Sequence, residues 1–335
     1  MVDRNNQSRS RTDAMLRSAF GKLICDALAD PSVVEIMQNP DGKLWVERAG
    51  RGRLTHGTVV TSAQAERIIR LVASLSGHDV TNERPIVSAE LPIGGQRFEG
   101  VMPPVVTAPA FAIRNHAAKV FTLGDYVDAG TMRAIDAATL REAVIARRNI
   151  LIVGGTGSGK TTLANGLLAE VAKTKDRVLI LEDTRELQCD ADDCVALRTQ
   201  PSVSMAELVR STLRLRPDRI VVGEVRGGEA LDLLKAWSTG HPGGVATVHA
   251  NSAADGLDRL EQLVGEVVAN VPRKLIATAV DIIVGIENVA GVRRVTDILG
   301  VLGCEDSGGY RLRPLMTDPA THTQSNPNPK KGVSS

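Results

Sequence analysis

The sequence predicts an α/β fold in which a parallel sheet with a phosphate-binding loop is flanked by helices and preceded by a smaller α+β domain. Two observations carry this prediction. From about residue 150 onward, short apolar runs alternate with helical patterns, and the first run leads into a glycine-rich segment that ends in Lys-Thr-Thr. Before residue 130, short runs of alternating polarity are mixed with two helical stretches. A regular alternation of strand and helix is typical of a parallel sheet with helices on both faces.

The composition is that of a globular protein, and its charge balance does not favour binding to a polyanion. The 335 residues leave room for two domains of about 100–200 residues each. Forty Lys and Arg residues stand against 39 Asp and Glu residues, so the positive excess typical of a nucleic-acid binder is absent. Only four Phe, two Trp and two Tyr residues are present, which argues against a platform for stacking single-stranded bases.

The cysteines and the apolar runs indicate a reduced, cytoplasmic protein. The four cysteines lack the paired Cys-x-x-Cys spacing of a zinc site; they are Cys25, Cys189, Cys194 and Cys304. No run of about 18 apolar residues exists, and the Arg-rich start lacks the apolar stretch of a signal peptide. We therefore expect no membrane span.

The first domain is expected over residues 14–130, after a polar segment at residues 1–13 that is expected to be disordered. The turn signal Asn39-Pro40-Asp41-Gly42 joins its first two strands. The expected helices cover residues 14–28 and 62–76, and the expected strands cover residues 33–37, 44–47, 86–91, 96–102 and 111–114.

A helical linker region at residues 131–147 leads into the second domain at residues 148–315. The apolar runs of this domain are short enough for buried strands. The expected strands cover residues 150–153, 178–181, 220–222, 245–248 and 282–286, and the expected helices cover residues 161–172, 204–213, 229–238 and 256–268. The Pro- and Asn-rich tail at residues 316–335 is expected to be disordered.

The first strand of the second domain leads directly into a match to the phosphate-binding pattern Gly-x-x-x-x-Gly-Lys-[Ser/Thr]. Backbone N–H groups of such a loop point at phosphate oxygens, and the positive end of the following helix adds to the attraction. We expect Lys160 to reach the β- and γ-phosphates of ATP and Thr161 to ligate Mg²⁺. The expected nucleotide-binding residues are Gly154, Gly155, Thr156, Gly157, Ser158, Gly159, Lys160, Thr161 and Thr162.

Carboxylates follow two further strands of the predicted sheet. Glu182 and Asp183 end the second strand, and Glu224 lies just past the third. The carboxyl ends of parallel strands form the ligand-binding edge, where carboxylates hold Mg²⁺ or its waters and position an attacking water. Arg226 is a charge partner, an intersubunit contact or a surface ion-pair residue. The expected metal-binding residues are Thr161, Glu182, Asp183 and Glu224.

Two histidines flank the fourth predicted strand. A histidine in this position is more often a hydrogen-bonded structural residue, and a separation of eight positions does not resemble the short spacing of a zinc site. Because His249 falls at the carboxyl end of its strand, we favour it as a sensor of the γ-phosphate. His241 is interpreted as a residue of the glycine-rich loop.

Four segments, taken in order, resemble the secretion and traffic ATPase family. The phosphate loop, Leu-Glu-Asp-Thr-Arg-Glu-Leu from residue 181, Arg-Pro-Asp-Arg-Ile-Val-Val-Gly-Glu-Val-Arg from residue 216 and Thr-Gly-His-Pro-Gly-Gly-Val-Ala-Thr-Val-His from residue 239 are similar to its Walker A, Asp box, Walker B and His box. The resemblance extends over residues 33–303 and is greatest to the conjugal-transfer members of TrbB type. The chain lacks the tetracysteine insertion common in type II secretion members and the C-terminal motif of pilus retraction motors.

The resemblance implies a hexameric ring of subunits, each with an N-terminal domain and a RecA-like P-loop domain that bind nucleotide between them. It also nominates Arg97 and Arg114 of the N-terminal domain as residues near the phosphates, a duty that suits the fixed charge and fork of arginine. The alternative is structural pairing of both arginines within a strand. We expect Arg97, Arg114 and Lys160 to face Glu182, Asp183 and Glu224 across one nucleotide cleft.

The function expected from these residues and this resemblance is Mg²⁺-dependent ATP hydrolysis that energises conjugal transfer or type IV secretion. The expected catalytic residues are Glu224, Lys160, Glu182, His249, Arg97 and Arg114. Expected partners are copies of the chain itself and inner-membrane channel proteins, with cytoplasmic localisation and peripheral membrane association. The alternatives are a nucleic-acid motor of RecA-like ring type, a type IV pilus or type II secretion motor, and a non-catalytic nucleotide-regulated scaffold.

Overall fold

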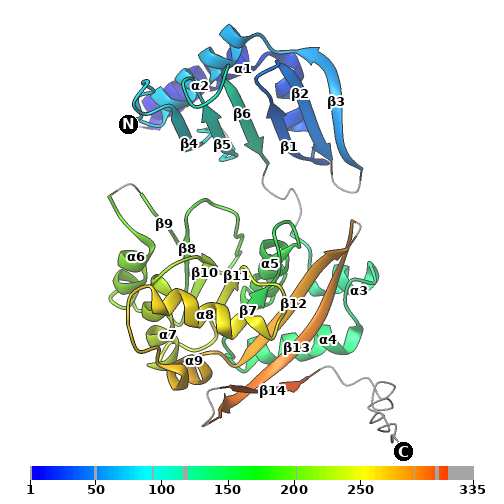
Figure 1. Ribbon diagram of the computed structural model, residues 1–335, viewed down its shortest axis with the longest axis vertical. Coiled ribbons are helices and arrows are strands. Elements are labelled where there is room, and N and C mark those ends of the chain that lie inside the picture. The colour runs from blue at the N-terminus through cyan, green and yellow to red at the C-terminus, as the bar shows by residue number, and fades with distance from the viewer. Residues whose placement is uncertain are drawn as a thin grey trace, which may run out of the picture. The chain divides into compact units, whose positions relative to one another are not determined.

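The computed structural model describes residues 2–315 except residues 49–50, 93, 116–119, 201, 290 and 306–308. Figure 1 labels the helices and strands of the chain, which divides into two compact units by its internal contacts. The first unit comprises Met1–Thr122 and Thr161–Arg214, and the second comprises Leu123–Lys160 and Leu215–Ser335. The predicted disordered tail at residues 316–335 lies outside the described residues.

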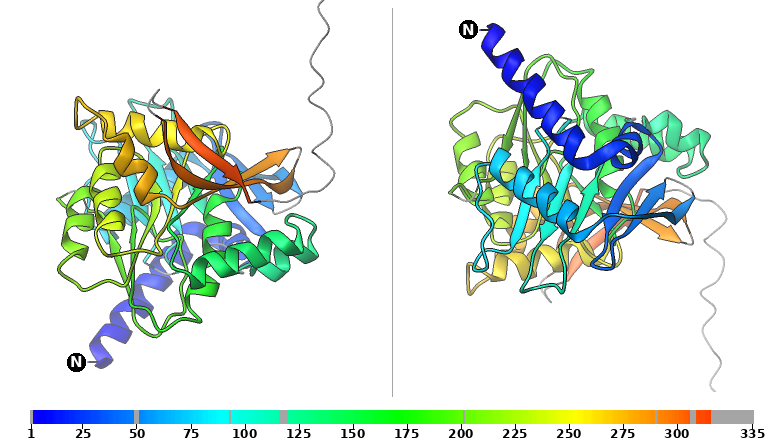
Figure 2. Two further views of the ribbon diagram at one scale, coloured as in Figure 1. Left: turned by 90° about the horizontal axis from the view of Figure 1, so that it is seen from below. Right: turned by 90° about the horizontal axis from the view of Figure 1, so that it is seen from above.

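The N-terminal part of the first unit is an antiparallel sheet with two helices on one face (Figure 2). The six strands lie in the order β3-β2-β1-β6-β5-β4. Their bounds are β1 Val33–Gln38, β2 Lys43–Arg48, β3 Gly52–Val59, β4 Ile86–Glu90, β5 Arg97–Val101 and β6 Ala110–Arg114, and the helices are α1 Val2–Ala29 and α2 Ser62–Leu75. The predicted strands are all present, and β3 is one that the sequence pattern did not indicate.

Helix α2 shows why this part folds as it does. Its first turn is capped by Thr61, whose hydroxyl accepts a hydrogen bond of 3.2 Å from the backbone N–H of Gln64. Ile68, Ile69 and Val72 lie on one face of the helix and are fully buried in the core beneath the sheet. Burial of such side chains contributes roughly 1.5–3 kcal/mol each, which fixes the face that α2 presents to the strands.

Helix α1 begins earlier than the sequence indicated. The predicted helix covers residues 14–28 and the predicted disorder residues 1–13, whereas α1 spans Val2–Ala29. An ion pair of 2.8 Å between Asp13 and Arg17, one helical turn apart, joins the two predicted segments. Such pairs contribute a few tenths of a kcal/mol to a helix and leave no trace in the apolar pattern from which the start was predicted.

The second sheet contains eight strands in the order β14-β13-β12-β7-β11-β10-β8-β9. The strands are β7 Ile150–Val153, β8 Val178–Glu182, β9 Cys194–Arg198, β10 Arg219–Val225, β11 Val245–Val248, β12 Ile282–Val289, β13 Val292–Cys304 and β14 Tyr310–Pro314. The helices around it are α3 Leu123–Asp128, α4 Ala134–Ile145, α5 Lys160–Val171, α6 Met205–Thr212, α7 Glu229–Ser238, α8 Asp255–Gly265 and α9 Arg273–Ala279.

Strand β7 lies at the centre of the second unit. It pairs in parallel with β11 on one side and β12 on the other, so that Ile150 is opposite both Val245 and Ile282. All four residues of β7 and all four of β11 are buried. A strand enclosed on both faces reads as an uninterrupted apolar run, which is why the sequence located these strands correctly.

The predicted fold class is confirmed, and the sheet is mixed rather than parallel throughout. The sequence pattern indicated five strands, whereas β9, β13 and β14 extend the sheet at its two ends. Strand β13 pairs with β12 and β14 in antiparallel fashion. Its residues are only partly buried, and such a strand lacks the continuous apolar run by which the central strands were found.

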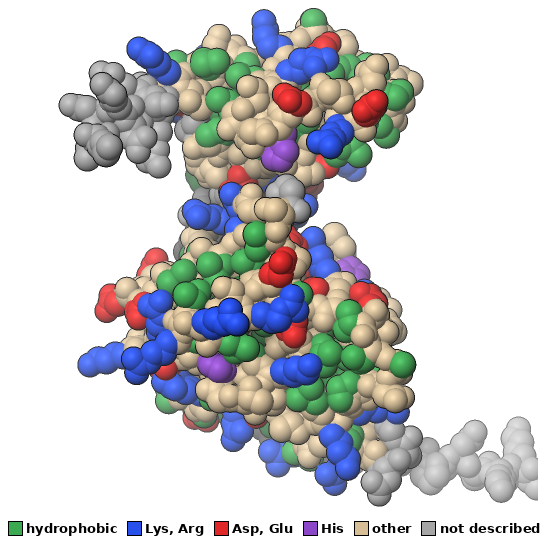
Figure 3. All heavy atoms as spheres, turned by 90° about the vertical axis from the view of Figure 1, so that its left-hand side faces the viewer, with side chains coloured by type: hydrophobic (Ala, Val, Ile, Leu, Met, Phe, Trp, Pro, Cys, Tyr) green, Lys and Arg blue, Asp and Glu red, His purple; other side chains and the backbone are tan. Residues whose placement is uncertain are grey.

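Charged side chains are dispersed over the face shown in Figure 3 rather than gathered in one continuous field. This distribution agrees with the balance of 40 basic and 39 acidic residues in the sequence. Within the described residues, every helix is too short or too polar to cross a membrane.

Candidate nucleotide site

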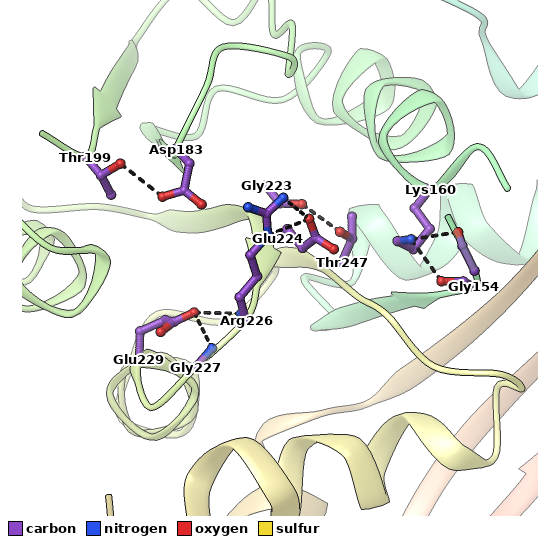
Figure 4. A network of polar contacts seen from close by, with 11 residues as sticks. Gly154, Lys160, Asp183, Thr199, Gly223, Glu224, Arg226, Gly227, Glu229 and Thr247 are labelled. Atoms are coloured by element: carbon purple, nitrogen blue, oxygen red, sulfur yellow. Dashed lines mark hydrogen bonds and ion pairs between the residues drawn. The ribbon is translucent and has the colours of Figure 1, made fainter. Parts of the chain in front are cut away.

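The phosphate loop connects the end of β7 to the start of α5. Gly157 and Gly159 adopt φ angles of 71° and 103°, a left-handed backbone that only glycine enters without strain. The ammonium group of Lys160 donates to the carbonyls of Gly154 and Gly155 at 2.9 and 3.0 Å (Figure 4). Lys160 is therefore turned into the loop, with its charge inside the curve of the backbone.

Two features make this loop a fit for phosphate. A Cβ on Gly154 would lie 2.3 Å from the carbonyl oxygen of Ile286 and 2.6 Å from the Ser158 hydroxyl, so no larger residue fits there. The Ser158 hydroxyl itself is buried and has no hydrogen-bond partner among the described residues. A buried hydroxyl without a partner costs about 1–3 kcal/mol, and a phosphate oxygen in the loop is a group that would satisfy it.

Helix α5 adds the electrostatic element that such a loop needs. Lys160 is its first residue, and Thr161 and Thr162 follow in the first turn. The first four N–H groups of a helix have no partner within it and carry a partial positive charge toward the loop. The donors here are thus backbone amides, an ammonium and hydroxyls, the set that binds phosphate oxygens.

Glu182, the last residue of β8, is a buried carboxylate with backbone partners. One of its oxygens, Oε1, accepts from the N–H groups of Glu186 at 2.9 Å and of Leu187 at 2.8 Å. Burial raises the pKa of Glu182 to about 7, against these two hydrogen bonds, which lower it. Glu182 thus holds the loop after β8 in place, and its Oε1 is occupied by these two hydrogen bonds.

Asp183 lies next to Glu182 and is exposed. Its Oδ1 accepts a hydrogen bond of 3.0 Å from the hydroxyl of Thr199 (Figure 4). The loop after β8 is also tied to α5, because Asn165 donates to the carbonyl of Glu186 at 3.1 Å. The Asp box is therefore fixed to both its own strand pair and the helix that follows the phosphate loop.

Glu224 lies near the end of β10 and is paired with Arg226. Both Nε and Nη2 of Arg226 donate to the same carboxylate oxygen, Oε2, at 2.8 and 2.5 Å. The backbone N–H groups of Arg226 and Gly227 donate in turn to Glu229, at 2.7 and 3.0 Å. Arg226 is thus exposed and paired with Glu224, and its role in the site stays a prediction.

The end of β11 places the two histidines differently. His249 directly follows the strand and is exposed, at the carboxyl end expected for a residue near the terminal phosphate. His241 contacts the carbonyl of Ala236 through Nδ1 at 3.3 Å and lies in the loop before the strand, as interpreted. Between them, the buried Thr247 donates to the carbonyl of Gly223 at 2.7 Å and so joins β11 to the residue before Glu224.

Arg97 and Arg114 are directly opposite each other on β5 and β6, at the end of the N-terminal sheet. Within the first unit, Arg97 and Asp183 line one pocket of about 640 Å³. Their expected approach to Lys160 and Glu224 would join the two units and stays a prediction. The alternative interpretation, structural pairing within the strands, describes the backbone positions of Arg97 and Arg114. It does not exclude that their side chains bind a ligand.

Glu90 also lines this pocket and was not predicted from the sequence. Glu90 is opposite Arg97 on β4, accepts from the backbone N–H of Arg185 at 3.1 Å, and forms an ion pair with Arg198. Its carboxylate thereby contacts both the Asp box and strand β9. No local motif marks Glu90, because its significance depends on contacts between residues about a hundred positions apart.

Metal ligation by protein side chains alone is not supported. Among the residues that the structure describes, no three His, Cys, Asp or Glu side chains gather closely enough to hold a metal ion. Mg²⁺ in a phosphate loop typically takes few protein ligands and completes its shell with phosphate oxygens and water. The hydroxyl of Thr161 is of the type that such a site uses.

Comparison with known proteins identifies the family of the chain. A model of the family described as type II/IV secretion system protein matches residues 20–290. A probable conjugal transfer protein TrbB of Sinorhizobium fredii (strain NBRC 101917 / NGR234) is 53% identical over 297 residues, which cover 88% of this chain and 91% of that protein. The conjugal transfer protein TrbB of Rhizobium radiobacter is 50% identical over 314 residues, covering 93% and 95%.

The fold has a counterpart among solved structures. The Legionella pneumophila ATPase DotB matches with a TM-score of 0.59 and 23% identity, over 86% of this chain and 80% of that one, and shows a likeness of fold. The family match covers the phosphate loop, the Asp box, Glu224 and His249. The chain belongs to the type II/IV secretion system protein family, and within it resembles conjugal transfer proteins of TrbB type.

Proposed function

We propose that the chain is a Mg²⁺-dependent ATP hydrolase that works as a hexameric ring and energises conjugal transfer or a related type IV secretion process. The observation that carries the proposal is the phosphate loop. It combines Lys160 turned into the loop, the buried Ser158 hydroxyl without a partner and the first turn of α5. These donors match the oxygens of a nucleotide's phosphate chain.

The binding of nucleotide is assigned to residues 154–162. Lys160 neutralises charge on the β- and γ-phosphates, while backbone N–H groups of the loop and of α5 orient their oxygens. When bound, Mg²⁺ supplies further neutralisation of charge on the phosphates. Thr161 would hold it through its hydroxyl, and Asp183 and Glu182 are the carboxylates that we assign to the ion or its waters.

Hydrolysis is assigned to Glu224, which positions or activates the attacking water. The ion pair of its Oε2 with Arg226 orients the carboxylate and leaves Oε1 outside the pair. The hydrogen bond from Thr247 to Gly223 fixes the backbone immediately before it. His249 follows β11, the strand between β7 and β10, and is assigned as sensor of the γ-phosphate.

Arg97 and Arg114 are assigned to the same nucleotide from the N-terminal sheet. Two guanidinium groups on adjacent strands concentrate positive charge at one edge, where they stabilise charge on the transferring phosphoryl group. Closure of the N-terminal part on nucleotide, and opening after hydrolysis, would convert the reaction into movement.

The partners follow from the family and the names of the relatives. We propose that six copies form the ring and that it docks on inner-membrane channel proteins from the cytoplasmic side. Gel filtration with and without ATP tests the ring, because a monomer under both conditions would contradict it. Extraction from membranes by high salt is the expected behaviour of a peripheral protein.

The experiment that tests the proposal is ATP turnover by the purified chain and its Lys160→Ala variant. Loss of the ammonium should lower kcat by about 100-fold or more, a typical effect of removing one donor that stabilises transition-state charge. Lys173→Ala, which removes an exposed lysine paired with Glu170, is the matched control and should leave turnover unchanged. Undiminished turnover in Lys160→Ala would refute the assignment, and steep stimulation by single-stranded DNA would favour the nucleic-acid motor.

A further inference from the structure

We propose that Arg293 of β13 binds the nucleoside part of the nucleotide and so helps to determine which phosphate compound the loop accepts; the inference rests on the proposed function. Arg293 lies far from the phosphate loop in sequence but against it in space. Its Cδ and Nε are 3.1 and 3.3 Å from the position that a Cβ on Gly159 would occupy. Gly159 is the residue directly before Lys160.

A second contact from the same hairpin reaches the loop. Asn288 on β12 is directly opposite Arg293 on β13, and its side-chain amide donates to the carbonyl of Gly157 at 3.5 Å. The carbonyl of Ile286 on β12 also closes on Gly154. One cross-strand pair and one backbone carbonyl thus contact three glycines of the loop from a single side.

The hairpin is held firmly enough to aim a side chain. Strands β12 and β13 are paired along the whole of β12, from Ile282 to Val289. Strand β12 is in turn paired with β7, and the N–H of Val295 on β13 donates to the carbonyl of Thr131 at 3.0 Å. The position of Arg293 is therefore set by a sheet rather than by a flexible loop, which favours a defined contact.

The order of the strands identifies which end of the nucleotide Arg293 meets. Glu224 and His249 belong to β10 and β11, on one side of β7, whereas the β12–β13 hairpin lies on the other side. If the terminal phosphate lies toward Glu224, as hydrolysis requires, the nucleoside lies away from it. The side of the loop that remains is the one covered by Arg293.

The chemistry of a guanidinium suits a nucleoside. Its plane stacks on a base, and its N–H groups donate to sugar hydroxyls. The second unit offers no exposed aromatic ring for that purpose, because its three aromatic residues are buried or half-buried; they are Tyr126, Trp237 and Tyr310. Arg293 is exposed, and within the described part of the chain no hydrogen bond or ion pair occupies it.

The test compares nucleotides with inorganic tripolyphosphate, which has three phosphates and no nucleoside. Binding of ATP, ADP and tripolyphosphate, each with Mg²⁺, is measured by calorimetry on the full chain and on Arg293→Ala. We expect the Kd of ATP and ADP to rise about tenfold, a loss in the range of a cation–π contact in a partly desolvated site. The Kd of tripolyphosphate should stay within about twofold of the wild-type value, because this compound has no nucleoside for Arg293 to contact.

Two further variants sharpen the result. Arg294→Ala removes the neighbouring exposed arginine, whose cross-strand partner is Glu287 and which alternation directs to the other face of β13, and should leave all three affinities unchanged. Arg293→Lys keeps the charge without the planar fork and should lose most of the affinity for ATP and ADP. If Arg293→Ala does not fold, Arg293→Lys tests the proposal in its place.

Each outcome decides the point. An equal loss of tripolyphosphate affinity would show that Arg293 acts on the phosphates or the loop, and would overturn the assignment while leaving the proposed function intact. Unchanged affinity for ATP and ADP in Arg293→Ala would also overturn it, as would full affinity in Arg293→Lys. A wild-type chain that binds none of the three compounds would refute the proposed function and this assignment with it.

Discussion

Arg226 binds a single oxygen of Glu224 with two of its nitrogens, at 2.8 and 2.5 Å. Two donors from one planar group fix the rotation of the carboxylate as well as its position. The backbone of Arg226 is itself held by Glu229. Glu224 is therefore oriented by Arg226, whose backbone is held by Glu229 within the same segment.

The variant Arg226→Ala tests whether this orientation matters. Removal of the guanidinium leaves Glu224 free to rotate, so we expect kcat for ATP hydrolysis to fall about tenfold while KM changes less than about threefold. Arg226→Lys retains one donor group, so its kcat should lie between the values for the wild type and Arg226→Ala. Arg259→Ala, on the exposed side of α8, is the control; equal activity of all four proteins would show that the pair is only a surface ion pair.

Replacement of Gly154 tests the close approach of β12 to the phosphate loop. Gly154→Ala forces a methyl group to within 2.3 Å of the Ile286 carbonyl, and overpacking of this kind costs about 1–3 kcal/mol. We expect a lower Tm and at least tenfold weaker ATP binding. Gly155→Ala is the matched control for the Tm, because a Cβ there meets nothing within 4 Å. A wild-type Tm in Gly154→Ala would contradict the described loop geometry.

The buried carboxyl of Glu182 makes stability depend on pH. Burial raises its pKa from 4.5 to about 7, so the folded chain binds this proton more tightly than the unfolded chain does. Its contribution is therefore fully present below about pH 4.5 and is lost as the pH rises toward 7. Relative to Glu182→Gln, the wild type should lose at most about 3 kcal/mol of unfolding free energy over this range.

Urea unfolding of wild type and Glu182→Gln at pH 5 and pH 8 provides the measurement. The difference between the two proteins should move in favour of the variant as the pH increases. Asp183→Asn, at an exposed neighbour, serves as the control and should show a smaller change with pH. A difference that is the same at both pH values would mean that Glu182 titrates near its ordinary pKa.

The hydrogen bond from Thr247 to Gly223 is expected to support both stability and catalysis. Thr247→Val keeps the shape but leaves the partly buried carbonyl of Gly223 without this partner, at a cost of about 1 kcal/mol. A Tm lower by about 2–6 °C, with a reduced kcat, is the expected result. Thr278→Val removes a comparable bond on the exposed side of α9 and should have little effect. No change in Tm for Thr247→Val would show that the bond is dispensable.

The central strands and the phosphate loop could be predicted from sequence because their signals are local. Strand β7 is buried on both faces, and the loop pattern depends on adjacent glycines and Lys160. The carboxyl-end rule placed His249 just past β11, as the structure has it, whereas Glu224 was expected just past its strand and lies inside β10, which extends to Val225. In each case the residue and the strand boundary on which the prediction depends lie within about ten positions of each other in the sequence.

Glu90 and Arg293 could not be predicted because their roles depend on pairing. Glu90 meets Arg198 through the approach of two strands, and Arg293 meets Gly159 through the register of the β12–β13 hairpin. A shift of one residue in that register would turn Arg293 to the opposite face. Helix α3, only six residues long, was missed for a different reason, since it is too short to show a helical period.

Glu224→Gln shows whether Glu224 activates the attacking water, because this change separates nucleotide binding from hydrolysis. The amide keeps the size of the side chain but cannot accept a proton from water, so kcat should fall by about 10²–10⁴-fold. The Kd for ATP, measured by calorimetry on the same preparation, should stay within about threefold of wild type. Turnover at the wild-type rate in Glu224→Gln would show that Glu224 does not activate the attacking water.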